Sequence, residues 1–115
     1  METSERRRDA RARISLPAYL LRRSGAESVE TLDASYRGMC IRSKLPLPYQ
    51  QLLKLRFDLP GREVPLKAHA VVMRVRADAM GRFEIGIRFF ALNGQDQVDW
   101  ESFVARKIYK RAEAA

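Results

Sequence analysis

The chain has 115 residues and a formal net charge of +8, with 46% hydrophobic and 31% charged residues. This length suits one globular domain with a modest core, and the composition excludes a largely disordered chain. No apolar run approaches the roughly 20 residues that span a bilayer, and the N-terminus lacks the apolar stretch of a secretory signal. We therefore expect a cytoplasmic protein without membrane insertion. The single cysteine, Cys40, excludes an internal disulfide and a structural zinc site.

The positive charge predicts an anionic partner: nucleic acid, a nucleotide, an acidic protein or a membrane surface. Of the 22 basic residues, 17 are arginine and 5 are lysine. Arginine's planar fork suits bidentate contact with phosphates and guanine edges, whereas lysine offers a point charge. Arginine-rich codon usage explains the same bias equally well.

The first 13 residues show no periodicity and are rich in arginine. We expect residues 1–13 to form a flexible arm ahead of one domain, which comprises a barrel over residues 14–92 and a helix over about residues 95–112. The arginines of this arm are Arg6, Arg7, Arg8, Arg11 and Arg13.

Short segments of period two follow, separated by turn residues, as in small all-β domains. Strong alternation runs through residues 53–59 and resumes at Val64 after the turn at Pro60 and Gly61. A further clear strand covers 83–89, and weaker strands cover 16–22, 28–33 and 39–43. Six strands suffice to close or nearly close a small antiparallel barrel, which we favour over a sandwich.

The period changes near the C-terminus, where Trp100, Phe103, Val104 and Ile108 recur at helical spacing after a cap at Asn93. Acidic residues early in this segment and basic residues late in it complement the helix dipole. We expect the apolar stripe of this helix to pack on the barrel, with a dimer contact as the alternative. The chain is accordingly expected to be a monomer or a weak homodimer.

Few residues could support catalysis. The sequence offers one histidine, His69, and one cysteine inside a predicted strand, so pairs of nucleophile and base are almost absent. The 6 glycines are scattered, and no strand precedes a helix through a glycine-rich phosphate loop. We expect no enzyme activity, no catalytic residue, no metal site and no cofactor.

Two motifs stand out when they are taken together. The arm contains E-R-R-R-D-A-R-A-R, and D-A-S-Y-R-G follows at residues 33–38. Each has an ordinary explanation, because basic tails are usually solvated and D-x-S-x-x-G fits many turns in which glycine supplies a positive φ. Both lie on one domain, with the arm before the first strand and the turn between the second and third, so that the arm could fold over the turn.

The pair of motifs resembles the PilZ domains, which bind the bacterial second messenger cyclic di-GMP through RxxxR and a downstream [D/N]xSxxG. The first motif is filled by Arg7 and Arg11, and the second by Asp33, Ser35 and Gly38. The G-I-R-F at residues 86–89 also resembles the family's last barrel strand. The resemblance covers residues 6–90 or so, and it implies a six-stranded antiparallel barrel that serves as a cyclic di-GMP receptor.

The resemblance assigns chemistry to these residues. Guanidinium groups of Arg7 and Arg11 would contact phosphate or the guanine Hoogsteen edge and could stack on a purine. The Asp33 carboxylate would accept hydrogen bonds from guanine N1 and N2, which selects guanine over adenine. Ser35 would supply a hydroxyl, and Gly38 would let backbone and ligand approach without a Cβ clash.

Four further residues are candidate ligand contacts. An arginine immediately before RxxxR, here Arg6, resembles family members that bind an intercalated dimer of the ligand. Arg8 flanks the motif, and Met73 stands near a position where many members have tryptophan, so the stacking surface is reduced here. Arg74 is a further contact or simply a solvent-facing strand residue.

The leading functional hypothesis is a non-catalytic receptor whose arm folds onto the barrel when ligand binds. The changed surface would regulate a separate, unidentified protein that acts in motility, pilus, chemotaxis or exopolysaccharide control. A second hypothesis is a basic small barrel that binds single-stranded nucleic acid. The exposed aromatic residues expected for base stacking are few, mainly Tyr36 and Tyr49, which disfavours it. A third is a PilZ-like adaptor that acts without ligand.

Overall fold

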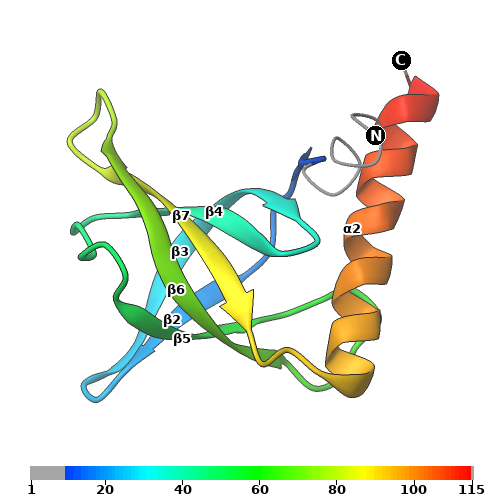
Figure 1. The fold of residues 1–115 in the computed structure, drawn as a ribbon, viewed down its shortest axis with the longest axis horizontal. Helices are drawn as coiled ribbons and strands as arrows, with labels where there is room; N and C mark the ends of the chain where they lie inside the picture. Colours follow the sequence, from blue (N-terminus) through cyan, green and yellow to red (C-terminus); the bar gives the residue numbers. More distant parts are fainter. Residues whose placement is uncertain (1–9, 115) are drawn as a thin grey trace.

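The protein is an antiparallel β-barrel with one helix beside it (Figure 1). The computed structural model describes residues 10–114. Its elements are β1 (Ala12–Arg13), β2 (Ala18–Arg22), β3 (Gly25–Ser35), β4 (Gly38–Ser43), β5 (Leu52–Phe57), β6 (Leu66–Ala77), β7 (Phe83–Phe90) and α2 (Gly94–Ala114).

Closure of the sheet leaves six strands in the barrel. The strand order is β1-β3-β2-β5-β6-β7-β4, and an additional β3–β4 pairing joins the two sides. Every pairing is antiparallel. The predicted fold class, a six-stranded antiparallel barrel with a C-terminal helix, is therefore confirmed, and β1 is an extra short strand on β3.

Two strands begin later than the alternation predicts, in each case directly after a proline. β2 begins at Ala18 after Pro17, and β6 begins at Leu66 after Pro65. Proline has no backbone N–H to donate to a neighbouring strand. Val64, which we expected in a strand, is 67% exposed and lies in the preceding loop.

The structure also differs from the expectation at the end of the predicted arm. Residues 1–13 were assigned to a flexible arm, but Ala12 and Arg13 form β1, paired with Ala34 and Asp33. Ala12 is buried, and the backbone N–H of Ile14 donates to the Leu32 carbonyl oxygen at 3.2 Å. A two-residue strand has no periodicity to detect, so packing and backbone pairing decide its structure.

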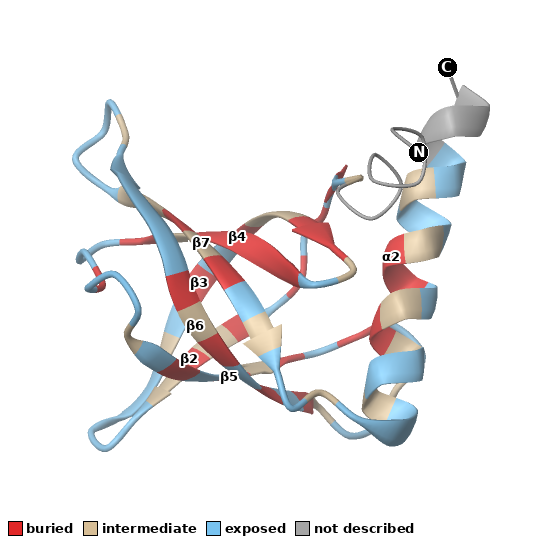
Figure 2. Ribbon diagram, in the orientation of Figure 1, coloured by how far each residue is buried: buried red, intermediate tan, exposed pale blue. Residues whose placement is uncertain are grey.

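Alternation along the strands fills the barrel interior (Figure 2). In β5 the inward residues Leu53, Leu55 and Phe57 are buried, whereas Leu52 and Lys54 are exposed. Burying each large apolar side chain stabilises the fold by about 1.5–3 kcal/mol.

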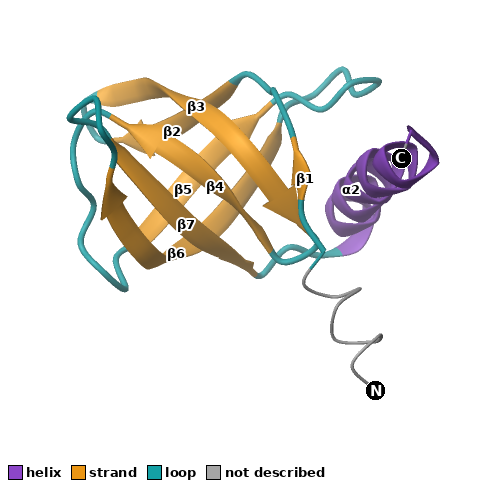
Figure 3. Ribbon diagram, turned by 90° about the horizontal axis from the view of Figure 1, so that it is seen from above, coloured by secondary structure: helices purple, strands orange, loops and turns teal. Residues whose placement is uncertain are grey.

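Helix α2 stands at one end of the barrel, with its axis across the strand ends (Figure 3). Its buried residues are Trp100, Phe103 and Val104, with Ile108 partly buried against the same core. The predicted stripe thus packs on its own barrel and is not left free for a second copy.

Arg62 connects the loop before β6 to the start of the helix through ion pairs with Asp96 at 2.9 Å and Asp99 at 3.0 Å. The carboxylate of Asp96 holds the pKa of Arg62 above its usual value by accepting this hydrogen bond. Among the residues described, no helix is long and apolar enough to cross a membrane.

Candidate functional site

Two β-bulges change which side chains face outward near one end of the barrel. In β3 the register with β4 shifts between Thr31 and Asp33, and in β6 the register with β7 shifts between Val72 and Arg74. One extra residue reverses the inward–outward alternation along a strand. Thr31 is buried before the first bulge, and Asp33 is partly exposed after it.

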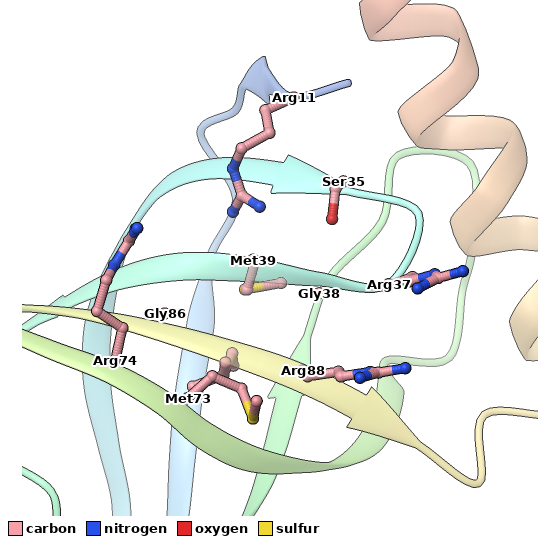
Figure 4. A pocket seen from close by; sticks show the side chains of 10 residues that line it. Arg11, Ser35, Arg37, Gly38, Met39, Met73, Arg74, Gly86 and Arg88 are labelled. Atoms are coloured by element: carbon pink, nitrogen blue, oxygen red, sulfur yellow. The ribbon is translucent and has the colours of Figure 1, made fainter. Parts of the chain in front are cut away.

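The bulged segments border a hollow on the barrel surface (Figure 4). It lies between the turn joining β3 and β4 and the facing parts of β6 and β7, and its volume is ≈ 480 Å³. Its lining residues are Arg11, Ser35, Arg37, Gly38, Met39, Met73, Arg74, Gly86, Ile87 and Arg88.

Four of these residues are arginines, and none of the described lining residues is a carboxylate. In Figure 4, Arg11 and Arg74 extend toward each other across the strands, and Arg37 and Arg88 lie side by side. Within residues 10–114, no ion pair involves Arg37, Arg74 or Arg88. Cations gathered without counter-charges favour an anionic ligand of high charge density.

Arg11 forms an ion pair with Asp33 at the edge of the hollow. The Arg11 Nε donates to Asp33 Oδ1 at 2.6 Å, and the two side chains are 43% and 34% exposed. This contact joins the second arginine of RxxxR to the first residue of the D-x-S-x-x-G motif. Asp33 itself lies beside the hollow and is not among its lining residues.

Gly38 has a steric role that differs from the one expected from the sequence. An added Cβ would overlap the backbone carbonyl oxygen of Ile87 on β7, whereas we had expected the glycine to make room for a ligand. The chain needs glycine here because β4 and β7 approach closely at this point. Gly86, which also lines the hollow, has ordinary room for a Cβ against the Arg74 side chain at 3.6 Å.

Apolar side chains form the floor of the hollow. Met39 is buried, whereas Met73 is 43% exposed at the β6 bulge. Cys40 lies buried in β4 behind this surface, and burial raises the pKa of its thiol. A thiol held protonated in this way is a poor nucleophile. In the described part of the chain, no group of three or more His, Cys, Asp or Glu side chains could hold a metal ion.

The predicted site residues that the structure describes lie close together, although one of them does not line the hollow. Arg11, Ser35, Gly38, Met73 and Arg74 line the hollow, and Asp33 borders it through Arg11. The remaining predicted contacts, Arg6, Arg7 and Arg8, lie outside the described residues.

Sequence reasoning missed Arg37 and Arg88 as members of this site. Arg37 stands inside D-A-S-Y-R-G, and Arg88 occupies an outward position of the 83–89 strand. Two features of the sequence could have indicated them: the position of Arg37 within the motif and the outward position of Arg88 in the alternating strand. The register of β4 on β7, which pairs Gly38 with Arg88, brings them together.

Several solved structures share this fold at low sequence identity. The chain is similar to the MrkH–c-di-GMP complex of K. pneumonia, with a TM-score of 0.74, 19% identity and coverage of 92% of this chain and 54% of that one. It is also similar to the Bacillus subtilis inhibitor of motility MotI/DgrA, with a TM-score of 0.71, 17% identity and coverage of 90% and 50%. The chain thus spans about half the length of these two proteins.

The PilZ domain of YcgR from Escherichia coli, solved with c-di-GMP, matches over 91% of this chain and 93% of that one, with a TM-score of 0.65 and 10% identity. No curated protein matches the sequence. The PilZ domain family matches residues 5–106, which include the RxxxR and D-x-S-x-x-G motifs, the whole barrel and most of α2. The chain therefore belongs to the PilZ domain family.

Proposed function

We propose that this protein is a non-catalytic receptor for cyclic di-GMP and that the hollow beside Arg11 is its ligand site. The observation that carries the proposal is the convergence of Arg11, Ser35 and Gly38 on a surface whose described lining residues include three further arginines and no carboxylate. Membership of the PilZ family and the c-di-GMP named in two of the similar structures support the same ligand.

The ligand's chemistry suits these side chains. Cyclic di-GMP carries two phosphates and two guanines, and a guanidinium can contact phosphate or the O6 and N7 atoms of guanine with two parallel hydrogen bonds. Arg11 and Arg74 face each other across the hollow, so that one ligand can contact both (Figure 4). Asp33, placed beside them, would accept hydrogen bonds from guanine N1 and N2.

The N-terminal segment supplies the rest of the site in this proposal. Arg7 precedes Arg11 by four positions, with Arg6 and Arg8 on either side of it. Closing this segment over the ligand costs about 1–2 kcal/mol for each residue that becomes fixed, and charge-assisted hydrogen bonds worth about 1.5–3 kcal/mol each offset it. Ligand binding therefore acts as a switch, and Arg6 would allow a second, intercalated ligand molecule.

We propose that a separate protein recognises the ligand-bound form of the receptor. Closure of the segment over the hollow changes the surface near β1 and the β3–β4 turn, and α2 contacts that turn through Trp100 and Ser35. A partner that recognises this changed surface would couple the level of the second messenger to motility, pilus, chemotaxis or exopolysaccharide output.

Calorimetric titration of cyclic di-GMP tests the receptor directly. Wild-type protein is compared with Arg7→Ala, Arg11→Ala and Arg13→Ala, the last being a matched control because Arg13 is exposed on β1 and does not line the hollow. Cyclic di-AMP and a short single-stranded DNA serve as ligand controls. We expect binding of the guanine ligand alone, at least tenfold weaker in the first two variants and unchanged in the third.

A folded wild-type protein that does not bind cyclic di-GMP would exclude the receptor. Binding of the DNA alone would then indicate a nucleic-acid-binding barrel, and binding of neither would indicate an adaptor that acts without ligand. A stoichiometry near two ligands per chain would support the intercalated dimer.

A further inference from the structure

The outer face of β5 and β6, with the flanking parts of β2 and β7, carries a regular grid of cationic and apolar side chains. The strand register sets them in three rows across the sheet. The rows are Tyr19–Arg56–Lys67, Lys54–His69–Phe90 and Leu52–Val71–Arg88. We call these nine residues the basic sheet face. Each row combines at least one cation with at least one apolar side chain, and no row contains a carboxylate.

Among the described residues, the cations of this face have no counter-charges. In the portion of the chain that the structure describes, none of Lys54, Arg56, Lys67 and Arg88 forms an ion pair. The carboxylates that form ion pairs in the described structure lie elsewhere, on β3 and β7, in the turn between β6 and β7, and at the start of α2. Charge is therefore segregated, and this face is left positive.

Two apolar members of the grid are exposed as well, and Tyr19 and Val71 are partly exposed. Leu52 is 69% and Phe90 is 41% exposed, whereas the inward residues of the same strands are buried. Helix α2 stands at the end of the barrel and does not cover this face (Figures 1 and 3). Apolar side chains interleaved with cations on an uncovered sheet are typical of a surface that contacts another macromolecule.

We propose that the basic sheet face binds an acidic, extended segment of another protein, in which carboxylates and apolar side chains alternate at every second residue and so share one face of the segment. Neighbouring strands are about 4.8 Å apart, and outward residues of one strand recur about every 6.8 Å. A short extended segment that places a carboxylate and an apolar group at this spacing satisfies both kinds of residue in the grid. Charge complementarity sets the orientation, and burial of Leu52, Val71 and Phe90 adds affinity.

A protein partner fits this face better than a single-stranded nucleic acid. Base stacking needs aromatic faces open to the ligand. The ring of Tyr19 is covered by the Arg56 guanidinium, whose Cζ lies 4.7 Å from the ring centroid. Phe90 lies against the His69 ring at 5.8 Å, and the remaining apolar members, Leu52 and Val71, have no aromatic ring.

The test uses a fluorescein-labelled synthetic peptide in which Glu and Leu alternate at every second position, with Ser between them, so that both lie on one face of the extended peptide. An all-Glu peptide, in which Glu replaces each Leu, and oligo-dT are the comparison probes. Binding is followed by fluorescence anisotropy, and the contact surface is mapped by amide chemical-shift changes in ¹⁵N-labelled protein. The variant Lys54→Glu/Lys67→Glu reverses two cations of the face. The control Lys44→Glu/Lys110→Glu makes the same change in net charge at exposed lysines outside it. Thermal unfolding confirms that both variants fold.

We expect the Glu-Leu peptide to bind more tightly than the all-Glu peptide and to shift amides of β5 and β6. We expect about a tenfold loss of affinity in Lys54→Glu/Lys67→Glu and less than a twofold loss in the control. No binding, equal losses in the two variants or shifts confined to another surface would overturn the proposal. Tighter binding of oligo-dT to the same amides would overturn the assignment of a protein partner. Arg88 also lines the hollow, but the variants change only lysines that do not line it, so these outcomes can be read whether or not the hollow binds cyclic di-GMP.

Discussion

The indole Nε1 of Trp100 donates a hydrogen bond to the backbone carbonyl oxygen of Ser35 at 3.2 Å. Trp100 is the central buried residue of α2, and Ser35 is the last residue of β3 and lines the hollow. Edge-to-face contacts join the same indole to Phe57 and Phe89 at ring-centroid distances of 5.2 Å. The helix is thereby fixed to both the core and the motif turn.

Replacing this tryptophan tests the connection. Trp100→Phe retains an aromatic ring but leaves the buried Ser35 carbonyl oxygen without its donor, which costs about 1–3 kcal/mol. We expect the free energy of unfolding, measured by urea denaturation, to fall by at least that amount. Tyr109→Phe, on the same helix at a side chain that is 67% exposed, should change it by less than about 0.5 kcal/mol. Similar stability of the two variants would show that the hydrogen bond does not hold the helix.

Gly38 and Gly86 provide a second, internally matched test. Both lie on the paired strands β4 and β7, and both line the hollow. Gly38→Ala drives a Cβ into the Ile87 carbonyl oxygen, so we expect a loss of about 1–3 kcal/mol or more from overpacking. Gly86→Ala meets only the Arg74 side chain at an ordinary distance and should keep its stability. Thermal unfolding measures both, and equal melting temperatures would contradict the close approach of the strands.

The sequence predicted the barrel because alternation with a period of two is a direct consequence of strand geometry. It also predicted the stripe of α2, and its second motif includes Ser35 and Gly38, which line the hollow, and Asp33, which lies beside it. The two bulges left no signal in the sequence, because one extra residue within a strand does not change its composition. Because of these bulges, Asp33 and Arg74 border the hollow. Arg37 and Arg88 meet only when the barrel closes, through a register between strands that are distant in sequence.

Stability should fall in acid partly through Asp78, in the turn between β6 and β7. Burial opposes ionisation of this carboxyl, but the backbone N–H groups of Arg82 and Met80 donate to it at 2.9 and 2.8 Å, and together with nearby arginines they lower its pKa below 3.8. A carboxyl whose pKa is lower in the folded state stabilises the protein above its unfolded pKa. That contribution is lost as the pH falls through the lower, folded value.

Urea denaturation of wild type and Asp78→Asn across the range from pH 7 to about pH 2 measures this contribution. We expect the variant to be less stable at neutral pH and the difference to shrink below the unfolded pKa. Glu63→Gln is the control, because Glu63 is exposed and, in the described structure, forms no ion pair. A difference between wild type and Asp78→Asn that stays constant with pH would contradict the role assigned to this carboxylate.

Comparing alanine variants of Arg74 and Arg76 distinguishes a direct contact with the ligand from a general effect of positive charge. Both are exposed on β6, but Arg74 lines the hollow, whereas Arg76 pairs with Glu84 at 3.1 Å. A charge-assisted hydrogen bond contributes about 1.5–3 kcal/mol, so Arg74→Ala should weaken cyclic di-GMP binding by about ten- to a hundredfold. Arg76→Ala removes the same charge and should change the Kd less than twofold.

Calorimetry of the two variants at two salt concentrations completes the comparison. Loss of a phosphate contact lowers the salt dependence of binding, because fewer counterions are displaced. We therefore expect the Kd of Arg74→Ala to vary less with salt than that of Arg76→Ala or wild type. Equal affinities and equal salt dependence in both variants would show that Arg74 does not contact the ligand and that the β6 bulge serves the barrel alone.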